Sequence, residues 1–389
     1  MSYNPQIFTN RVELEEVIES QRELLADGMT SLEFFRVITV VMSAIRCGHS
    51  FVIIPSAIIG EVFDAESAYP IDVRLIEGKL YVVGIDGDTQ LEFGDEIVSI
   101  DGISTQDVTA DMMRYLSADG EGTAYKTIVF SQYYLYYYQL YLATEEAIDV
   151  EYIDDSTGAS QSETLTRNCP NVHGWVQEEP FEATYEDDVA IMTLRTFYPE
   201  YPYTLTDFYL FFEEFFQTVA SQGIHKMILD IRGNGGGDPR VASRLLSYLL
   251  PEPAPYFAPE SPNYYTGLKD RVPLSEPHYD GRLATLADAF CFSTCGHFAS
   301  LLQFHQVGVI IGEETGGGYT CSDTSRNFTL SNTMMQIRTS TTQWTVAVED
   351  MTKGRGALPS IHAYMSLEDY RDEVDRVYLT GIEWLNEQE

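Results

Sequence analysis

A short apolar strand that runs into a glycine-rich turn decides the fold of this chain: Met227-Ile228-Leu229-Asp230-Ile231-Arg232-Gly233-Asn234-Gly235-Gly236-Gly237. The first five residues predict a buried strand, and the periodic apolar pattern that follows the turn predicts a helix. Similar patterns alternate along this half of the chain, with strands expected at 189–197, 286–292 and 307–311 and helices at 205–220, 241–250 and from Ser293 onward. Repeated strand–helix units favour an α/β layered domain.

Composition narrows the class of protein before any motif is considered. The chain has 389 residues, 44% of them apolar, which suits two or three domains with packed cores. Its 60 acidic and 23 basic residues leave a formal charge of −37, which repels phosphate backbones and anionic lipid. We therefore expect no nucleic-acid partner and no membrane insertion. Five scattered cysteines without a CxxC pair indicate neither a disulfide scaffold nor a zinc site of that kind.

Changes in the pattern of apolar and turn-forming residues divide the chain into three expected parts: an N-terminal helical segment at 1–54, a β-rich insert at 55–170 and an α/β core at 171–389. In the first part, Thr30 and Glu33 form a capping-box pattern ahead of an apolar helical stripe. In the second, turn pairs such as Asp101-Gly102 separate short apolar runs. We interpret the Tyr-rich segment at 133–142 as packing within that insert.

Three segments of the core are candidates for chemistry. The glycine turn at 233–237 can present backbone N–H groups to a phosphate or an oxyanion, but it lacks the Gly-Lys-Ser/Thr ending of a P-loop. Ser293 stands where a strand meets a helix, and a helix N-terminus favours developing negative charge. Taken alone, Ser293 suits a helix N-cap equally well. The third segment, Gly312-Glu313-Glu314-Thr315-Gly316-Gly317-Gly318, is by itself a flexible turn.

Taken together and in this order, the three segments resemble the core of the C-terminal processing (tail-specific) and tricorn-type serine peptidases, serine peptidase family 41. The resemblance spans about 45 to 360, and residues 91–104 resemble the start of that family's PDZ-like module. It implies an α/β (α+β) fold with a ClpP/crotonase-like β-β-α spiral core and an inserted PDZ-like domain. It also implies Ser293 as the nucleophile, with an oxyanion hole formed by the N–H of Thr294 and that of Gly235 or Gly236.

The residues that match the family's base position indicate which branch the chain resembles. The lysine of the processing-peptidase branch falls on Gly318, and no lysine occurs between Lys269 and Lys353, so we expect no Ser–Lys dyad. Histidine suits the task of a base near neutral pH. The segment around His49 resembles the D-G-H-T-like segment of the tricorn-like branch, which implies His49 as the base. His297, four residues after Ser293, is the rival.

A histidine base needs a carboxylate that orients it. In the tricorn-like branch a glutamate follows the nucleophile by somewhat under sixty residues, which implies Glu349, 56 residues after Ser293, with Asp350 as the alternative. The relay serine of that branch falls on Gly48 here. We therefore expect His49 to contact its carboxylate directly or through a water.

The sequence predicts a serine endopeptidase that hydrolyses unfolded or extended polypeptides through an acyl-enzyme on Ser293. It needs no cofactor. A non-catalytic binding module on the same fold and an esterase with the same triad are the alternatives. The sequence does not indicate the natural substrate, the cleavage preference, substrate binding by the PDZ-like insert, homo-oligomerisation or the compartment. Residues 1–16 show no export signal, whereas the resemblance implies an extracytoplasmic protein.

Overall fold

A six-stranded, mostly parallel sheet forms the centre of the computed structural model, which describes residues 8–56, 58, 68–143, 145–167 and 179–387. The five parallel strands follow the order β17-β12-β11-β10-β9, and β8 pairs antiparallel with β9 at the edge. The six strands are β8 (Phe181–Glu186), β9 (Val189–Leu194), β10 (Lys226–Asp230), β11 (Arg282–Ala287), β12 (Val309–Gly312) and β17 (Ile361–His362). This arrangement confirms the α/β class.

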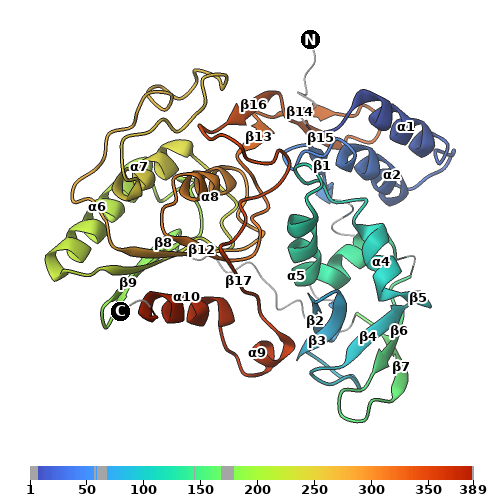
Figure 1. Ribbon diagram of the computed structural model, residues 1–389. Coiled ribbons are helices and arrows are strands. Elements are labelled where there is room, and N and C mark those ends of the chain that lie inside the picture. Colours follow the sequence, from blue (N-terminus) through green and yellow to red (C-terminus); the bar gives the residue numbers. More distant parts are fainter. Residues whose placement is uncertain (1–7, 57, 59–67, 144, 168–178, 388–389) are drawn as a thin grey trace.

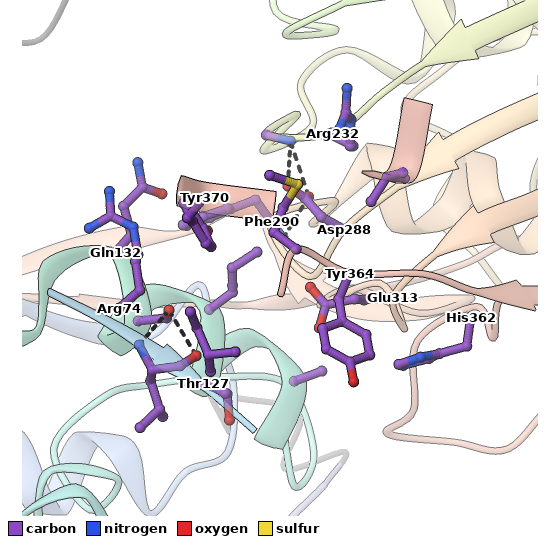
Figure 2. A pocket seen from close by; sticks show the side chains of 18 of the residues that line it. Arg74, Thr127, Gln132, Arg232, Asp288, Phe290, Glu313, His362, Tyr364 and Tyr370 are labelled. Atoms are coloured by element: carbon purple, nitrogen blue, oxygen red, sulfur yellow. Dashed lines mark hydrogen bonds between the residues drawn. The ribbon is translucent and has the colours of Figure 1, made fainter. Parts of the chain in front are cut away.

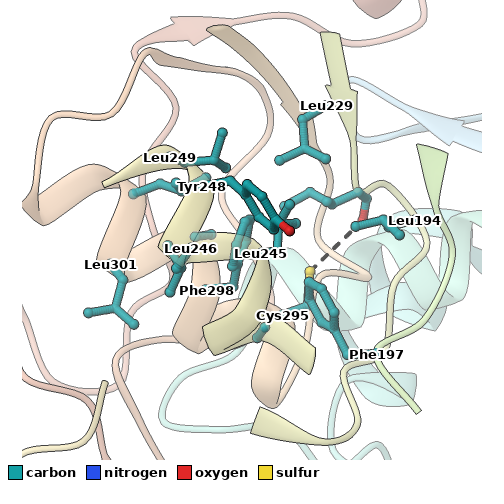
Figure 3. Close-up of a cluster of buried hydrophobic side chains, with 14 of the residues drawn as sticks. Leu194, Phe197, Leu229, Leu245, Leu246, Tyr248, Leu249, Cys295, Phe298 and Leu301 are labelled. Carbon is teal, nitrogen blue, oxygen red and sulfur yellow. Dashed lines mark hydrogen bonds between the residues drawn. The ribbon is translucent and has the colours of Figure 1, made fainter. Parts of the chain in front are cut away.

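Helices cover both faces of this sheet (Figure 1). One face carries α6 (Leu205–Gln222), α7 (Pro239–Leu249) and α8 (Thr294–Phe304), and the other carries α10 (Arg376–Asn386), which follows the short α9 (Leu367–Arg371). Figure 3 shows how Tyr248, Phe298 and their leucine neighbours fill the space between α7, α8 and the strands. Removal of this much apolar surface from water is the main force that holds α8, and with it Ser293, in place.

A second unit packs around its own core. It contains the antiparallel sheet β2-β3-β4-β6-β7, with β5 beside β4, and two helices that follow β5. Its elements are β2 (Ile71–Ile76), β3 (Lys79–Ile85), β4 (Glu96–Ile100), β5 (Ile103–Ser104), α4 (Thr105–Met112), α5 (Thr123–Tyr141), β6 (Ile148–Ile153) and β7 (Ser160–Leu165). The Tyr-rich segment lies in α5, where Tyr134, Tyr138 and Tyr141 are buried, so its interpretation as packing is confirmed.

The N-terminal segment joins the two units. It forms α1 (Arg11–Arg22) and α2 (Ser31–Ser43), and the capping box of Thr30 and Glu33 is present. The next strand, β1 (Phe51–Ile53), pairs antiparallel with a strand almost 300 residues later, so that Val52 lies opposite Ile337. The late strands are β13 (Thr320–Asp323), β14 (Arg326–Thr329), β15 (Gln336–Thr339) and β16 (Thr342–Thr345). This pairing holds residues 46–50 against the core.

Two strands end earlier than the sequence predicts: the run predicted at 189–197 forms β9, which ends at Leu194, and the second is β11. The run at 286–292 was expected to be a strand, but β11 ends at Ala287. Asp288 accepts hydrogen bonds from the N–H groups of Phe290 and Gly233, at 3.0 and 3.1 Å, and these bonds turn the chain out of the sheet. After this turn the chain reaches Ser293, which lies directly before the first residue of α8, Thr294.

The domain boundaries stay a prediction, because the boundary at 170/171, together with Cys169, lies outside the described residues. The PDZ-like character of the insert also stays a prediction. None of the helices in the described ranges has the length and apolarity needed to cross a membrane.

Candidate active site

Ser293 occupies a strained turn at the start of α8. Its backbone has φ 54° and ψ −123°, a conformation that residues other than glycine rarely adopt. The glycine turn supports this conformation, since the N–H of Phe292 donates to the carbonyl of Asn234 at 3.1 Å. Ser293 is half-buried, and its side chain makes no capping hydrogen bond to the helix that follows it.

His49 reaches Ser293 from the opposite end of the sequence. Its Nε2 lies 3.1 Å from Ser293 Oγ across a separation of 244 residues. Side chains from the late strands hold the histidine turn. Ser50 Oγ is 3.1 Å from Ser340 Oγ, and Ser325 Oγ donates to the His49 carbonyl at 3.3 Å. The structure thus brings together the nucleophile and the base that the resemblance implies.

The surroundings of His49 favour its neutral form. The ring lies against Phe292, with centroids 5.1 Å apart. Burial lowers the pKa of His49 below its ordinary value, while the charge of Asp323 opposes the shift and that of Arg338 adds to it. A neutral imidazole whose Nε2 faces a hydroxyl can accept the hydroxyl proton.

Close contacts accompany two departures from the family pattern. A Cβ at Gly48, where the tricorn-like branch has its relay serine, would lie 2.4 Å from Cζ of the Phe292 side chain. A Cβ at Gly318, the position of the absent lysine, would lie 2.1 Å from the carbonyl oxygen of Arg355. A side chain at Gly318 would thus collide with the backbone, and one at Gly48 would require the Phe292 ring to move.

The glycine turn and the start of α8 meet beside Ser293. A Cβ at Gly236 would lie 2.8 Å from both Ser293 Cβ and the Thr294 nitrogen. The N–H of Gly236 already donates to Oδ1 of Asn234 at 2.9 Å, whereas no hydrogen bond among the described residues uses the N–H of Gly235 or of Thr294. Those two N–H groups are therefore the ones left to receive a charged oxygen.

Substitution of Gly236 tests the importance of this close packing. Gly236→Ala should lower kcat by at least about 10²-fold, because φ is +100° and the methyl group would displace Ser293 together with the N–H of Thr294, a candidate oxyanion donor. Gly235→Ala is the matched control, since a Cβ there meets nothing within 4 Å and the N–H is kept. Steady-state kinetics of both variants measures the two losses of kcat. Equal losses would contradict the importance of the close packing at Gly236.

No hydrogen bond joins His49 to either of the carboxylates that the resemblance implies, so their role stays a prediction. Glu349 and Asp350 are exposed, and no side-chain hydrogen bond or ion pair joins either to another described residue. Nδ1 of His49 is buried without a hydrogen-bond partner in the described part of the chain. His297 is not a rival base in this geometry, because it is fully buried and burial lowers its pKa to about 3.

The structure adds one carboxylate that the sequence did not indicate. A carboxylate oxygen of Asp119, a ring nitrogen of His49 and Sγ of Cys47 lie within 4.8 Å of one another. Burial raises the pKa of Asp119 to about 7. Among the described residues this is the one group of His, Cys and acidic side chains with spacing that suits a metal ion. The pair Asp119-Gly120 reads in the sequence as an ordinary turn, so no local pattern marks it.

A cavity near this site is lined by residues that do not include Ser293. It has a volume of about 1040 Å³ and lies between β2 and α5 on one side and the carboxyl ends of β9 to β12 on the other. Figure 2 shows Arg74 and Gln132 on the first side, facing Arg232, Asp288 and Glu313 on the second. Its wall at Phe290 is three residues from the nucleophile.

Comparison with solved structures shows that the fold is a known one. Mature CPAF matches with a TM-score of 0.65 and 14% identity over 96% of this chain and 90% of its own. Mature CPAF complexed with lactacystin matches with a TM-score of 0.66 and 15% identity, over 99% of this chain and 94% of its own. A protein from Parabacteroides merdae ATCC 43184 matches with a TM-score of 0.53 and 14% identity, over 100% of this chain and 93% of its own. No curated protein matches the chain by sequence.

The family follows from the sequence of the core. Residues 188–362 match the model of peptidase family S41. This range contains the glycine turn, Ser293 and the segment 312–318, while His49 and Asp119 lie before it. The core of this chain, residues 188–362, is therefore that of a family S41 peptidase, which supports a serine-type peptidase.

Proposed function

We propose that this chain is an endopeptidase that cleaves peptide bonds through an acyl-enzyme on Ser293, with His49 as the general base. The observation that carries this proposal is the 3.1 Å distance between His49 Nε2 and Ser293 Oγ. A nucleophile and a base within hydrogen-bond reach are the signature of covalent acyl transfer. No other described histidine has a hydrogen bond to a nucleophilic side chain, which supports this pair as the reacting groups.

The steps follow from this geometry. As Ser293 Oγ attacks the scissile carbonyl carbon, its proton passes to Nε2 of His49, and the carbonyl oxygen becomes an oxyanion. The N–H groups of Thr294 and Gly235 stabilise that oxyanion, helped by the N-terminus of α8. The C–N bond then breaks, and His49 returns the proton to the leaving amine. Water repeats the sequence on the ester and releases the second product.

Extended or unfolded polypeptides are the substrates that suit this site. Ser293 and His49 are only partly exposed on turns between packed elements, so a scissile bond must leave its own fold to reach them. The charge of −37 favours neutral or basic segments over acidic ones. Substrate does not pair with the edge strand β2 at Leu75. Ser131 Oγ already bonds both the N–H and the carbonyl of that residue, at 3.0 and 3.2 Å.

Hydrolysis of matched protein substrates tests the function. We expect an unfolded, reduced and alkylated protein to be cut at internal bonds, with its native form cut far more slowly, as followed by mass spectrometry of the products. Ser293→Ala is the control for contaminating proteases. Cleavage of small acyl esters without cleavage of any polypeptide would favour the esterase. Tight binding of an apolar ligand without turnover would favour the binding module.

A further inference from the structure

The orienting group of His49 is the part of the mechanism that the described contacts leave open. With Nε2 at Ser293, the other ring nitrogen, Nδ1, is buried and has no hydrogen-bond partner among the described residues. An imidazole without a partner at Nδ1 is free to exchange tautomers, and only the form with the proton on Nδ1 can accept at Nε2. The exposed Glu349 does not supply that partner.

Asp119 has an unused acceptor, and its carboxylate lies near the His49 ring. Its side chain is 4% exposed, and Oδ1 accepts the N–H of Gly48 at 2.9 Å. Oδ2 is buried and has no hydrogen-bond partner in the described ranges. A carboxylate oxygen of Asp119 is within 4.8 Å of a ring nitrogen of His49. Two buried, unpartnered polar atoms of complementary type thus belong to neighbouring side chains.

We propose that Asp119 is the positioning carboxylate of this site: Oδ2 accepts the Nδ1–H of His49, directly or through one water, and so directs Nε2 at Ser293. This inference rests on the proposed function. A separation of up to 4.8 Å is bridged either by a small rotation or by one water that bonds both groups. The role belongs to a segment between α4 and α5, outside the part of the chain that matches the peptidase family.

The fold locks Asp119 to the histidine turn. Besides the Gly48 bond, the N–H of Gly120 donates to the carbonyl of Arg46 at 3.0 Å. Gly120 has φ +61°, and a Cβ there would lie 2.5 Å from the carbonyl oxygen of Gly354. Residues 119–120 are therefore held between the turn at 46–48 and the loop at Gly354, so the carboxylate keeps its place relative to the turn that carries His49.

The charges around the pair suit this role. Burial raises the pKa of Asp119 and lowers that of His49, so each group by itself resists ionisation. When Ser293 transfers its proton, the imidazolium forms beside the carboxylate and each charge compensates the other. Asp323 is the other acid whose charge acts on both groups, but its carboxylate already accepts from Ser325 and Arg338, at 2.9 and 3.4 Å.

The test is Asp119→Asn in the full chain. The amide oxygen can keep the Gly48 bond, while the amide NH₂ replaces the acceptor and forces the His49 proton onto Nε2. We expect kcat to fall by about 10²- to 10⁴-fold, with KM changed by no more than about twofold. The melting temperature should not fall, because the substitution removes a buried carboxylate that no described cation pairs with. Asp95→Asn, at a 3% exposed aspartate in the turn before β4, is the matched control and should leave kcat unchanged.

Two further readouts separate positioning from simple packing. Nitrogen-15 NMR of the histidines, with His49 assigned by its loss in His49→Ala, should show the proton on Nδ1 in the wild type and on Nε2 in Asp119→Asn. Glu349→Gln should cost much less kcat than Asp119→Asn. The reverse ranking, or an unchanged tautomer, would overturn the proposal. So would activity that is lost on dialysis against EDTA and restored by zinc, because Cys47, His49 and Asp119 would then be metal ligands.

Failure of this inference is distinguishable from failure of the proposed function. If Asp119 has no positioning role, the wild type and Asp119→Asn hydrolyse substrate at the same rate and a fluorophosphonate labels both at Ser293. If the proposed function is wrong, the wild type itself is not labelled at Ser293 and does not turn over polypeptide.

Discussion

Ser293→Ala should abolish peptide hydrolysis, with kcat lower on the order of 10⁶-fold, because no other group can form the acyl-enzyme. A fluorophosphonate probe should label the wild type and not the variant, as read by in-gel fluorescence and by mass spectrometry of the labelled peptide. Labelling depends on a serine activated by its base, and the 3.1 Å contact between Ser293 Oγ and His49 Nε2 is the structural basis for it.

Ser300→Ala is the matched control for this result. Ser300 lies buried in the same helix and donates from Oγ to the carbonyl of Gly296 at 2.7 Å, so it is a serine of α8 without access to substrate. The variant should keep both labelling and turnover. Persistent labelling of Ser293→Ala would mean that another residue is the nucleophile and would remove the basis of the proposed mechanism.

His49→Ala should lower kcat by about 10⁴- to 10⁶-fold while the protein stays folded. The base removes the proton that otherwise keeps Ser293 Oγ a poor nucleophile, and the strained backbone at Ser293 does not depend on the imidazole. Circular dichroism checks the fold, and His225→Ala, at an exposed histidine before β10, is the control. Near-normal turnover of His49→Ala would transfer the role of base to a different group.

The pH dependence of the wild type follows from the same residue. His49 must be neutral to act as a base, and burial lowers its pKa, so it stays neutral to a lower pH than an exposed histidine does. The acid limb of kcat/KM should therefore have its midpoint below about pH 6.5, the ordinary value for histidine. A midpoint above that value would show that the base is ionised more easily than its surroundings in this structure allow.

Much of the core could be predicted from local patterns. The alternation of apolar strands and amphipathic helices between β9 and α8 follows from side-chain periodicity, which a single sequence displays directly. The position of Ser293 between a strand and a helix could be found for the same reason, whereas its role as nucleophile was implied by the family resemblance. The end of β11 at Ala287 was missed, since the apolar run continues to Phe292 while Asp288 turns the chain by hydrogen bonds that composition does not reveal.

The carboxylate that we propose as the orienting acid, Asp119, could not be found in this way. Glu349 was chosen by its spacing from Ser293, and spacing along the chain says little about distance in space once a loop intervenes. Asp119 lies in the second unit and reaches His49 only because residues 119–120 are bonded to the turn at 46–48. Nothing in the neighbourhood of Asp119 in the sequence distinguishes it from a turn aspartate on the surface.

The sequence by itself determined the α/β class and the peptidase family of the core, because both are written in short segments with their own periodicity or glycine pattern. The roles of Ser293 and His49 are what the family resemblance implies, and they stay predictions. Only the tertiary structure decided how the site is assembled. It brought His49 to Ser293 through the pairing of β1 with β15, and it buried Asp119 beside His49. The physical reason is that long-range strand pairing and loop clamping set these distances, and they depend on residues hundreds of positions apart.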